Sequence, residues 1–149
     1  MAEVLFYHLE VRPLESVLPQ LLEKTLERGW RAVVETGSRD RAEALDAMLW
    51  IYRDDSFLPH GLGGEETDAH QPILLTDDPA ANPNEAVVRF FVDRAVPQSA
   101  DGYKRIVYMF SGHDPDAVAE ARNAWRTLRN GNEVTYWQQE ADGRWVKKA

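Results

Sequence analysis

The sequence has no cysteine among its 149 residues, which excludes a disulfide framework, a thiolate metal site and a cysteine nucleophile. It also has no apolar run near the roughly 18 residues of a membrane span, and no basic region at its start like that of a secretory signal. We therefore expect a cytoplasmic protein. Residues 1–149 have the length of a single domain with one core.

Basic residues are also scarce, since 17 Lys and Arg face 25 Asp and Glu and leave a net charge of -8. This deficit opposes tight binding to nucleic acid, because neutralising phosphates needs a surplus of cations. The charge is uneven: residues 1–102 hold 9 basic and 19 acidic side chains, whereas residues 103–149 hold 8 and 6. An acidic partner is therefore expected on the C-terminal third, and direct nucleic-acid contact is expected to be weak or absent.

Patterns typical of catalytic and cofactor sites are missing. The glycine cluster at 61–64 runs into two glutamates, which would repel a phosphate, and it does not join a strand to a helix. The four histidines never show the i, i+4 spacing of a helical metal site. Ser56 and His60 lack a third group to orient them. We expect no metal, no cofactor and no enzymatic activity of the chain by itself.

Strand and helix patterns alternate in the first third of the chain. An apolar strand at 4–9 precedes a helix in which Ser16 is the expected N-cap, Pro19 lies in the first turn and Gly29 ends the helix. A strand at 30–35 then precedes a helix capped by Ser38. This alternation predicts a mainly parallel sheet covered by helices.

The rest of the chain continues the same pattern after a break. Residues 52–72 show no sustained period and are expected to form a long loop. Four further strands are expected at 73–76, 86–92, 105–110 and 134–137. Asp114 and Pro115 provide an N-cap and a first helical residue, and this helix is expected to run to about Asn130, before Gly131.

The last helix carries three arginines on one face. Arg122, Arg126 and Arg129 are spaced i, i+4 and i+7, and Trp125 lies beside them. Guanidinium groups suit a carboxylate or phosphate, and an aromatic ring suits an apolar side chain, so an acidic peptide with a hydrophobic end fits best. The alternative is a solvated face whose arginines pair with local acids such as Glu120.

A second feature is the large apolar side chains that continue past the end of the helix that Ser38 caps. Trp50 and Phe57 would be anchors for a partner if they are exposed. In the alternative interpretation, both side chains fold back onto the core.

Several of these segments together resemble the chi family of DNA polymerase III accessory subunits. The similarity is carried by short motifs spread in order along the chain: Val4-Leu5-Phe6-Tyr7, Leu45-Asp46, Leu49-Trp50, Asp55-Ser56-Phe57-Leu58-Pro59-His60-Gly61, Ala121-Arg122, Trp125 and Tyr136-Trp137. The most specific of them is the tryptophan followed by Ser-Phe-Leu-Pro-His.

The resemblance implies a Rossmann-like three-layer α/β/α domain with a mostly parallel, mixed sheet. It also implies an adaptor that links the clamp-loader complex to the acidic C-terminal tail of single-stranded DNA-binding protein. Arg122 matches the tail-binding arginine and Trp125 a pocket aromatic. Val118 stands where some members carry Lys, so Arg126 or Arg129 is expected to substitute for it.

The resemblance also implies a second protein contact. Trp50, Phe57 and the adjoining Leu58 match the surface that binds the psi subunit or a competing helicase.

Two other functions stay open from the sequence. One is a nucleotide-dependent α/β enzyme that uses the crevice at the switch point of the sheet. The other is direct DNA binding by the aromatic tail, in which Tyr136, Trp137 and Trp145 would stack on bases beside Lys147 and Lys148.

Overall fold

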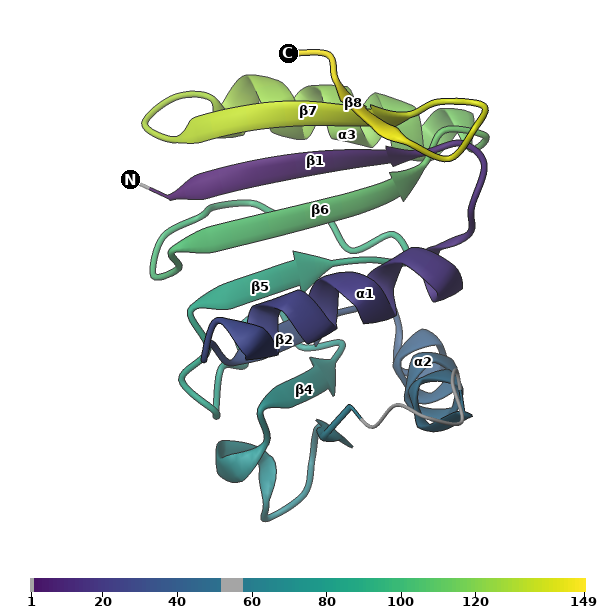
Figure 1. The fold of residues 1–149 in the computed structure, drawn as a ribbon. Helices are drawn as coiled ribbons and strands as arrows, with labels where there is room; N and C mark the ends of the chain where they lie inside the picture. The colour runs from purple at the N-terminus through teal and green to yellow at the C-terminus, as the bar shows by residue number, and fades with distance from the viewer. Residues whose placement is uncertain (1, 52–57) are drawn as a thin grey trace.

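The computed structural model describes residues 2–51 and 58–149 (Figure 1). Within these residues the elements are β1 (Glu3–Leu9), α1 (Leu14–Glu27), β2 (Ala32–Glu35), α2 (Arg39–Ile51), β3 (His60–Leu62), the 3-10 turn η1 (Asp68–His70), β4 (Ile73–Thr76), β5 (Val88–Phe91), β6 (Arg105–Ser111), α3 (Pro115–Leu128), β7 (Glu133–Gln139) and β8 (Trp145–Lys147). The strands form one sheet in the order β3-β4-β2-β5-β6-β1-β7-β8. Only β8, at one edge, is antiparallel to its neighbour, so the predicted mostly parallel α/β fold is confirmed.

The order of the strands explains which face each helix covers. From β1 to β2 and on to β3 the chain moves toward one edge of the sheet, by way of α1 and α2. From β6 to β7 it moves toward the other edge by way of α3. Right-handed crossovers in opposite directions put their helices on opposite faces. Figure 1 shows α1 in front of the sheet, α3 behind it, and α2 end-on at the lower right. The buried Leu45 and Leu49 of α2 belong to the same layer as those of α1, which gives three layers.

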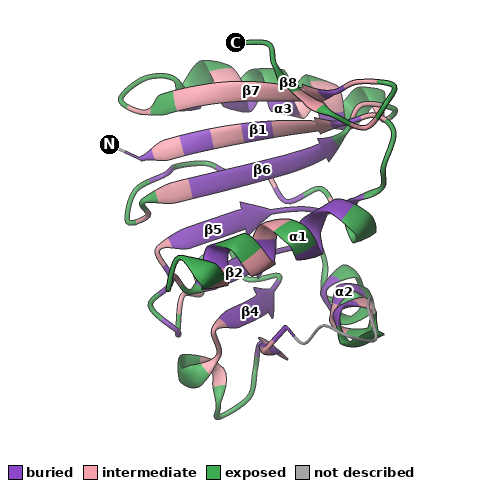
Figure 2. Cartoon of the chain, in the orientation of Figure 1, coloured by how far each residue is buried: buried purple, intermediate pink, exposed green. Residues whose placement is uncertain are grey.

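Each face of the sheet has its own buried layer. On the α1 and α2 face, alternate strand residues such as Val34, Phe90 and Met109 pack against helix residues such as Leu18 and Leu45. The α3 face is more aromatic, and its larger buried side chains are Phe6, Phe91, Tyr108 and Phe110, packed on three alanines of α3. Figure 2 shows the central strands buried along most of their length. Burial on both faces explains the continuous apolar runs of the parallel strands.

The helix ends follow capping rules, with one exception. Asp114 accepts hydrogen bonds from the backbone N–H groups of Asp116 and Ala117, and Ser38 accepts one from Arg41. Both predicted caps are therefore confirmed. The prediction for Ser16 was wrong, because α1 already begins at Leu14 after Pro13, and the Ser16 hydroxyl donates to the Pro13 carbonyl instead.

The early start of α1 also changes the position of its proline. Pro19 is the sixth residue of the helix and is buried, so it lies beyond the tolerant first turn. At the other end of α1, Gly29 has φ of +78° and follows the C-cap, as predicted.

The predicted loop at 52–72 contains a strand and a turn, which corrects the prediction. His60, Gly61 and Leu62 pair in parallel with the first three residues of β4. Gly61 and Gly63 serve close contacts there: a Cβ on Gly61 would lie 2.7 Å from the Gln71 side chain, and Gly63 donates its N–H to the Leu75 carbonyl. Gly61 therefore lies in an edge strand, and Gly63 and Gly64 directly follow it.

Among the described residues, no helix has both the length and the apolar character needed to cross a membrane.

Candidate protein-interaction site

Helix α3 presents a stripe of side chains on the side of the helix near β7, the strand next to the β8 edge of the sheet. Val118, Arg122, Trp125 and Arg129 are spaced i, i+4, i+7 and i+11, which places them on one side of the helix. Arg122 and Arg129 are exposed, whereas Val118 and Trp125 are half-buried. Arg126 is exposed on the adjoining side. All five residues predicted for the tail site therefore lie on accessible parts of one helix.

Beside these arginines lies an apolar shelf, formed by Val118, Trp125, Val134 and Tyr136. The Trp125 ring meets Tyr136 edge-on, with centroids 5.9 Å apart, and meets Phe6 edge-on at 5.4 Å. Such aromatic contacts fix the ring planes. The shelf remains half-exposed, so an apolar side chain of a partner can pack on it.

The three arginines of this face, Arg122, Arg126 and Arg129, make no ion pair with any residue in the described ranges. Arg126 donates only to the Asn123 side chain, over 3.3 Å. Glu120, the acid that was their alternative partner, pairs with Arg94 instead. Their guanidinium groups are consequently available to an outside anion.

Tyr136 links this face to the interior, a role that the sequence did not indicate. Its hydroxyl lies 2.6 Å from His8 Nδ1, and His8 Nε2 lies 2.6 Å from Glu10 Oε1. Burial raises the pKa of the Tyr136 hydroxyl, and the nearby charge of Arg122 offsets part of that shift. The hydroxyl is therefore neutral and within the field of Arg122. One sequence signal for this role exists. If β1 and β7 are aligned in parallel by their period-2 patterns, Tyr136 lies opposite Phe6 and therefore on the same face of the sheet.

The second predicted surface is only partly described. Trp50 is 49% exposed and Ile51 79% exposed at the end of α2, and the Trp50 ring packs on His60 with centroids 4.2 Å apart. Leu58 is 2% exposed and belongs to the core under α1 and α2, so it does not form part of a contact surface. Phe57 lies outside the described residues.

The aromatic residues of the C-terminal tail do not form one stacking surface. Tyr136 lies on the α3 face, whereas Trp145 lies on the other face and packs edge-on against Tyr7, with centroids 4.9 Å apart. Trp137 is half-buried and donates to Thr135, and Lys148 pairs with Glu140. Base stacking needs adjacent exposed rings, so this arrangement does not favour direct DNA binding.

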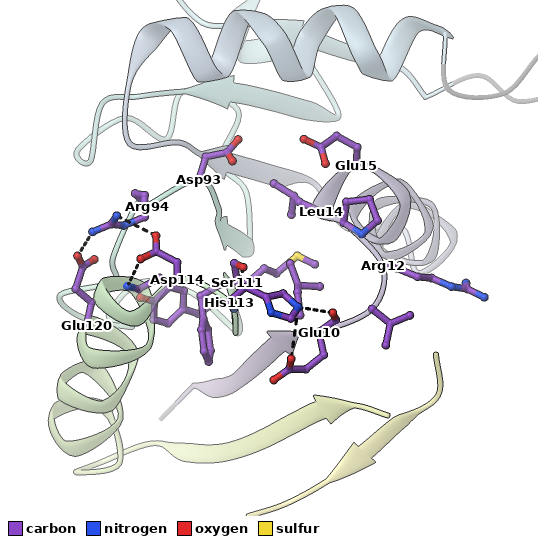
Figure 3. A pocket seen from close by; sticks show the side chains of 17 residues that line it. Glu10, Arg12, Leu14, Glu15, Asp93, Arg94, Ser111, His113, Asp114 and Glu120 are labelled. Carbon is purple, nitrogen blue, oxygen red and sulfur yellow. Dashed lines mark hydrogen bonds and ion pairs between the residues drawn. The ribbon is translucent and has the colours of Figure 1, made fainter. Parts of the chain in front are cut away.

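A cavity of about 510 Å³ lies where the enzyme alternative would need one (Figure 3). It opens at the carboxyl ends of β1 and β6, the neighbouring strands whose connections leave toward opposite faces. Its lining holds five carboxylates, Glu10, Glu15, Asp93, Asp114 and Glu120, against two arginines. A cavity with this charge disfavours a nucleotide phosphate.

Comparisons with known proteins agree with the sequence motifs. The family model described as "DNA polymerase III chi subunit, HolC" matches residues 1–135. A probable DNA polymerase III subunit chi of Rickettsia prowazekii is 32% identical over 88 residues, which are 59% of this chain and 53% of that protein. The DNA polymerase III subunit chi of Pseudomonas aeruginosa is 24% identical over 115 residues, 76% of this chain and 78% of that protein. The match thus spans about half of the first relative's length. Since the family model covers most of the sequence, the chain belongs to the DNA polymerase III chi subunit family.

Proposed function

We propose that the protein is a non-catalytic accessory subunit of the bacterial DNA polymerase III holoenzyme. In this role it joins the clamp-loader complex to the acidic C-terminal tail of single-stranded DNA-binding protein. The observation that carries the proposal is the arginine face of α3, which has no ion-pair partner in the part of the chain that the structure describes, beside the apolar shelf. An acidic peptide that ends in an apolar residue with a free carboxylate matches both parts of this surface.

Arg122 is the proposed contact for the terminal carboxylate. It lies on the same side of α3 as Trp125, within the field of the Tyr136 hydroxyl, so a carboxylate bound there would leave the adjoining apolar side chain on the shelf. Arg guanidinium can bind a carboxylate with two parallel hydrogen bonds. Arg126 and Arg129, one turn and two turns further on, would attract the acidic residues that precede the end of the tail.

Val118 sets one limit on this site. Where a lysine at this position would add a charge contact, Val118 adds only apolar area to the shelf. We therefore expect the affinity for the tail to depend more on Arg122 and Trp125 than it would if a lysine stood at position 118.

The second proposed contact, with a psi-like clamp-loader subunit or a helicase, uses the exposed Trp50 and Ile51 at the end of α2. A large exposed tryptophan is typical of an anchor residue in an interface. Helix α2 lies beside β3 and β4, at one end of the strand order, whereas α3 contacts β6 and lies behind β7, near the other end (Figure 1). Two partners bound at these places would not overlap, as an adaptor requires.

The proposal is tested by fluorescence anisotropy of a labelled peptide that copies the C-terminal tail of the cognate single-stranded DNA-binding protein. The wild type should bind it, and binding should weaken as salt rises because exposed charges are screened. Arg122→Ala should weaken binding by about tenfold or more, the effect of losing a charge-assisted hydrogen bond.

A matched control is Arg144→Ala, because Arg144 is 83% exposed in the turn between β7 and β8 and pairs only with Asp142 among the described residues. This variant removes the same charge from the protein and should keep the wild-type affinity. Equal losses in both variants would mean that only net charge matters, and a folded wild type that ignores the peptide at low salt would refute the proposed tail site.

A further inference from the structure

We propose that the cavity at the carboxyl ends of β1 and β6 binds an organic cation on an aliphatic chain, an alkylammonium or an alkylguanidinium group. Open α/β sheets bind ligands at the point where neighbouring connections leave toward opposite faces. Here the segment 9–15 after β1, the residues Asp93 and Arg94 after β5, and the segment 108–114 together enclose about 510 Å³. This volume suits a small ligand or one long side chain.

The charged groups of the cavity leave it negative. Arg94, one of its two arginines, pairs with Asp114 and Glu120. The other, Arg12, directs its guanidinium away from the cavity (Figure 3). Arg41 does not line the cavity but lies between Glu15 and Asp93. Its Nη2 is 3.6 Å from Glu15 Oε1, and its Nε is 3.3 Å from Asp93 Oδ2. The fifth carboxylate, Glu10, lies 2.6 Å from His8 and 3.6 Å from His113, which also lines the cavity. Within the described residues, the five carboxylates thus have only two arginines, Arg94 and Arg41, as permanent cations, and a bound cation would relieve their mutual repulsion.

The interior of the cavity is apolar where the stem of such a ligand would lie. Leu9, Leu14, Met109 and Phe110 are buried side chains that line it. An alkyl chain gains free energy when it leaves water for such a surface. The combination of an apolar interior with acidic groups around it selects for a charged group on a hydrocarbon stem.

Two polar atoms at the cavity lack hydrogen bonds within the described residues, and each is an acceptor; of the two, only Asp93 Oδ2 is itself fully buried. Tyr108 is 2% exposed and lines the cavity, yet its hydroxyl forms no hydrogen bond with any described residue. Burial, and next Glu120, raise the pKa of this hydroxyl, so it stays neutral. Asp93 Oδ2 is buried without a hydrogen bond, although Arg41 Nε is 3.3 Å away. A buried acceptor without a donor is costly, and an ammonium or guanidinium group supplies donors.

The backbone fixes the position of Asp93. Asp93 and Arg94 both have positive φ, 48° and 77°, which residues with a side chain rarely adopt. The Asp93 carbonyl accepts the N–H of Gly37, and a Cβ at Gly37 would lie only 2.6 Å from that oxygen. The carboxylate is therefore held at the cavity by a turn that has little freedom to move.

The cation could be a free amine or the Lys or Arg side chain of another protein, and one titration distinguishes these sources. The ¹⁵N-labelled full chain is titrated with agmatine, with n-butylamine and with the blocked peptide acetyl-Gly-Arg-Gly-amide, while amide resonances are followed by NMR. n-Butanol, which has the same stem without the charge, and glutarate are the controls. Binding of the cations should shift the amides of Glu10, Asp93 and Asp114 to saturation.

Asp93→Asn is the informative variant, because asparagine tolerates positive φ and the change removes only the charge. This variant should weaken the binding of agmatine about tenfold or more. Asp101→Asn, in an exposed turn before β6, should change nothing. Glu120→Gln replaces Asp93→Asn if that variant does not fold. Saturable binding of the blocked peptide would assign the site to a partner's side chain, and binding of the free amines alone would assign it to a small amine.

The proposal is overturned if none of the three cationic probes causes saturable shifts at the cavity of the wild type. It is also overturned if n-butanol or glutarate shifts the same amides equally, or if Asp93→Asn and Glu120→Gln both bind agmatine as the wild type does.

Discussion

The Arg89 guanidinium donates to a single oxygen of Glu35, from Nε over 3.0 Å and from Nη2 over 2.8 Å, inside the sheet. Its other hydrogen bonds go to the Ala81 and Asp78 carbonyls and to the Tyr103 hydroxyl. All five N–H donors of the guanidinium are therefore used. Through this one side chain, β2 and β5 are tied to the loops that precede and follow β5.

We expect Arg89→Met to lower the free energy of unfolding by about 3–5 kcal/mol, because it leaves the buried Glu35 carboxylate without a partner. Urea denaturation followed by circular dichroism measures this change. The double variant Arg89→Met with Glu35→Leu should recover most of the loss, since it removes both charges. If the double variant is as unstable as the sum of the single ones, the two side chains are not coupled.

A second prediction concerns Tyr136. The Tyr136 hydroxyl is hydrogen-bonded to His8 Nδ1 over 2.6 Å, and its oxygen lies within the field of the positive Arg122. The partial negative charge of the hydroxyl oxygen attracts the Arg122 guanidinium, so we expect the hydroxyl to help orient it for the peptide carboxylate. We expect Tyr136→Phe to weaken binding of the acidic tail peptide by roughly threefold, the effect of one neutral hydrogen bond, with the fold intact.

The matched control for Tyr136→Phe is Tyr103→Phe, which also removes one hydroxyl but contacts Arg89 and not the α3 face. Tyr103→Phe should leave the peptide affinity unchanged. An unchanged affinity in Tyr136→Phe would show that Arg122 needs no orienting group.

The pH dependence of stability gives a third prediction. Burial raises the pKa of Asp93 above its usual 3.8, and its hydrogen bond with Arg41 offsets part of the shift. Between 3.8 and the raised value the folded state binds more protons than the unfolded state, so the contribution of Asp93 to stability falls as pH rises through this window.

Asp93→Asn lacks this titration. Its free energy of unfolding, relative to that of the wild type, should therefore increase as pH rises through the same window, in urea titrations at matched pH values. For the exposed control Asp101→Asn, the free energy of unfolding relative to the wild type should not change with pH over this window. A relative stability of Asp93→Asn that falls with pH would contradict the raised pKa.

The sequence predicted those features of the fold that depend on local rules. Asp114 followed by Pro115 is a strong local signal for a helix start, and the apolar runs at β4 and β6 are typical of strands buried on both faces of a parallel sheet. The similar run at β1 also predicted a strand, although only alternate parts of β1 are fully buried. Strand β3 was missed because three residues carry no period, and its pairing depends on the close approach that Gly61 and Gly63 permit.

The candidate site could be predicted only as far as it lies on one helix. The spacing of Arg122, Trp125 and Arg129 placed them on one side of α3 before any tertiary contact was known. The involvement of Tyr136 depends on β7 pairing with β1, which are more than 120 residues apart in the chain. Burial of Leu58 likewise depends on packing under α1 and α2 and left no local signal.

The most direct test of the tail site is a double-mutant cycle between Arg122 and the terminal carboxylate of the peptide. Anisotropy is measured for the wild type and Arg122→Ala, each with the free-acid tail peptide and with the same peptide amidated at its C-terminus. If Arg122 binds that carboxylate, amidation of the peptide should strongly lower its affinity for the wild type and only slightly lower its affinity for Arg122→Ala. The coupling energy should be about 1–3 kcal/mol. If amidation weakens both proteins by the same factor, Arg122 does not bind the carboxylate and the proposed site is wrong.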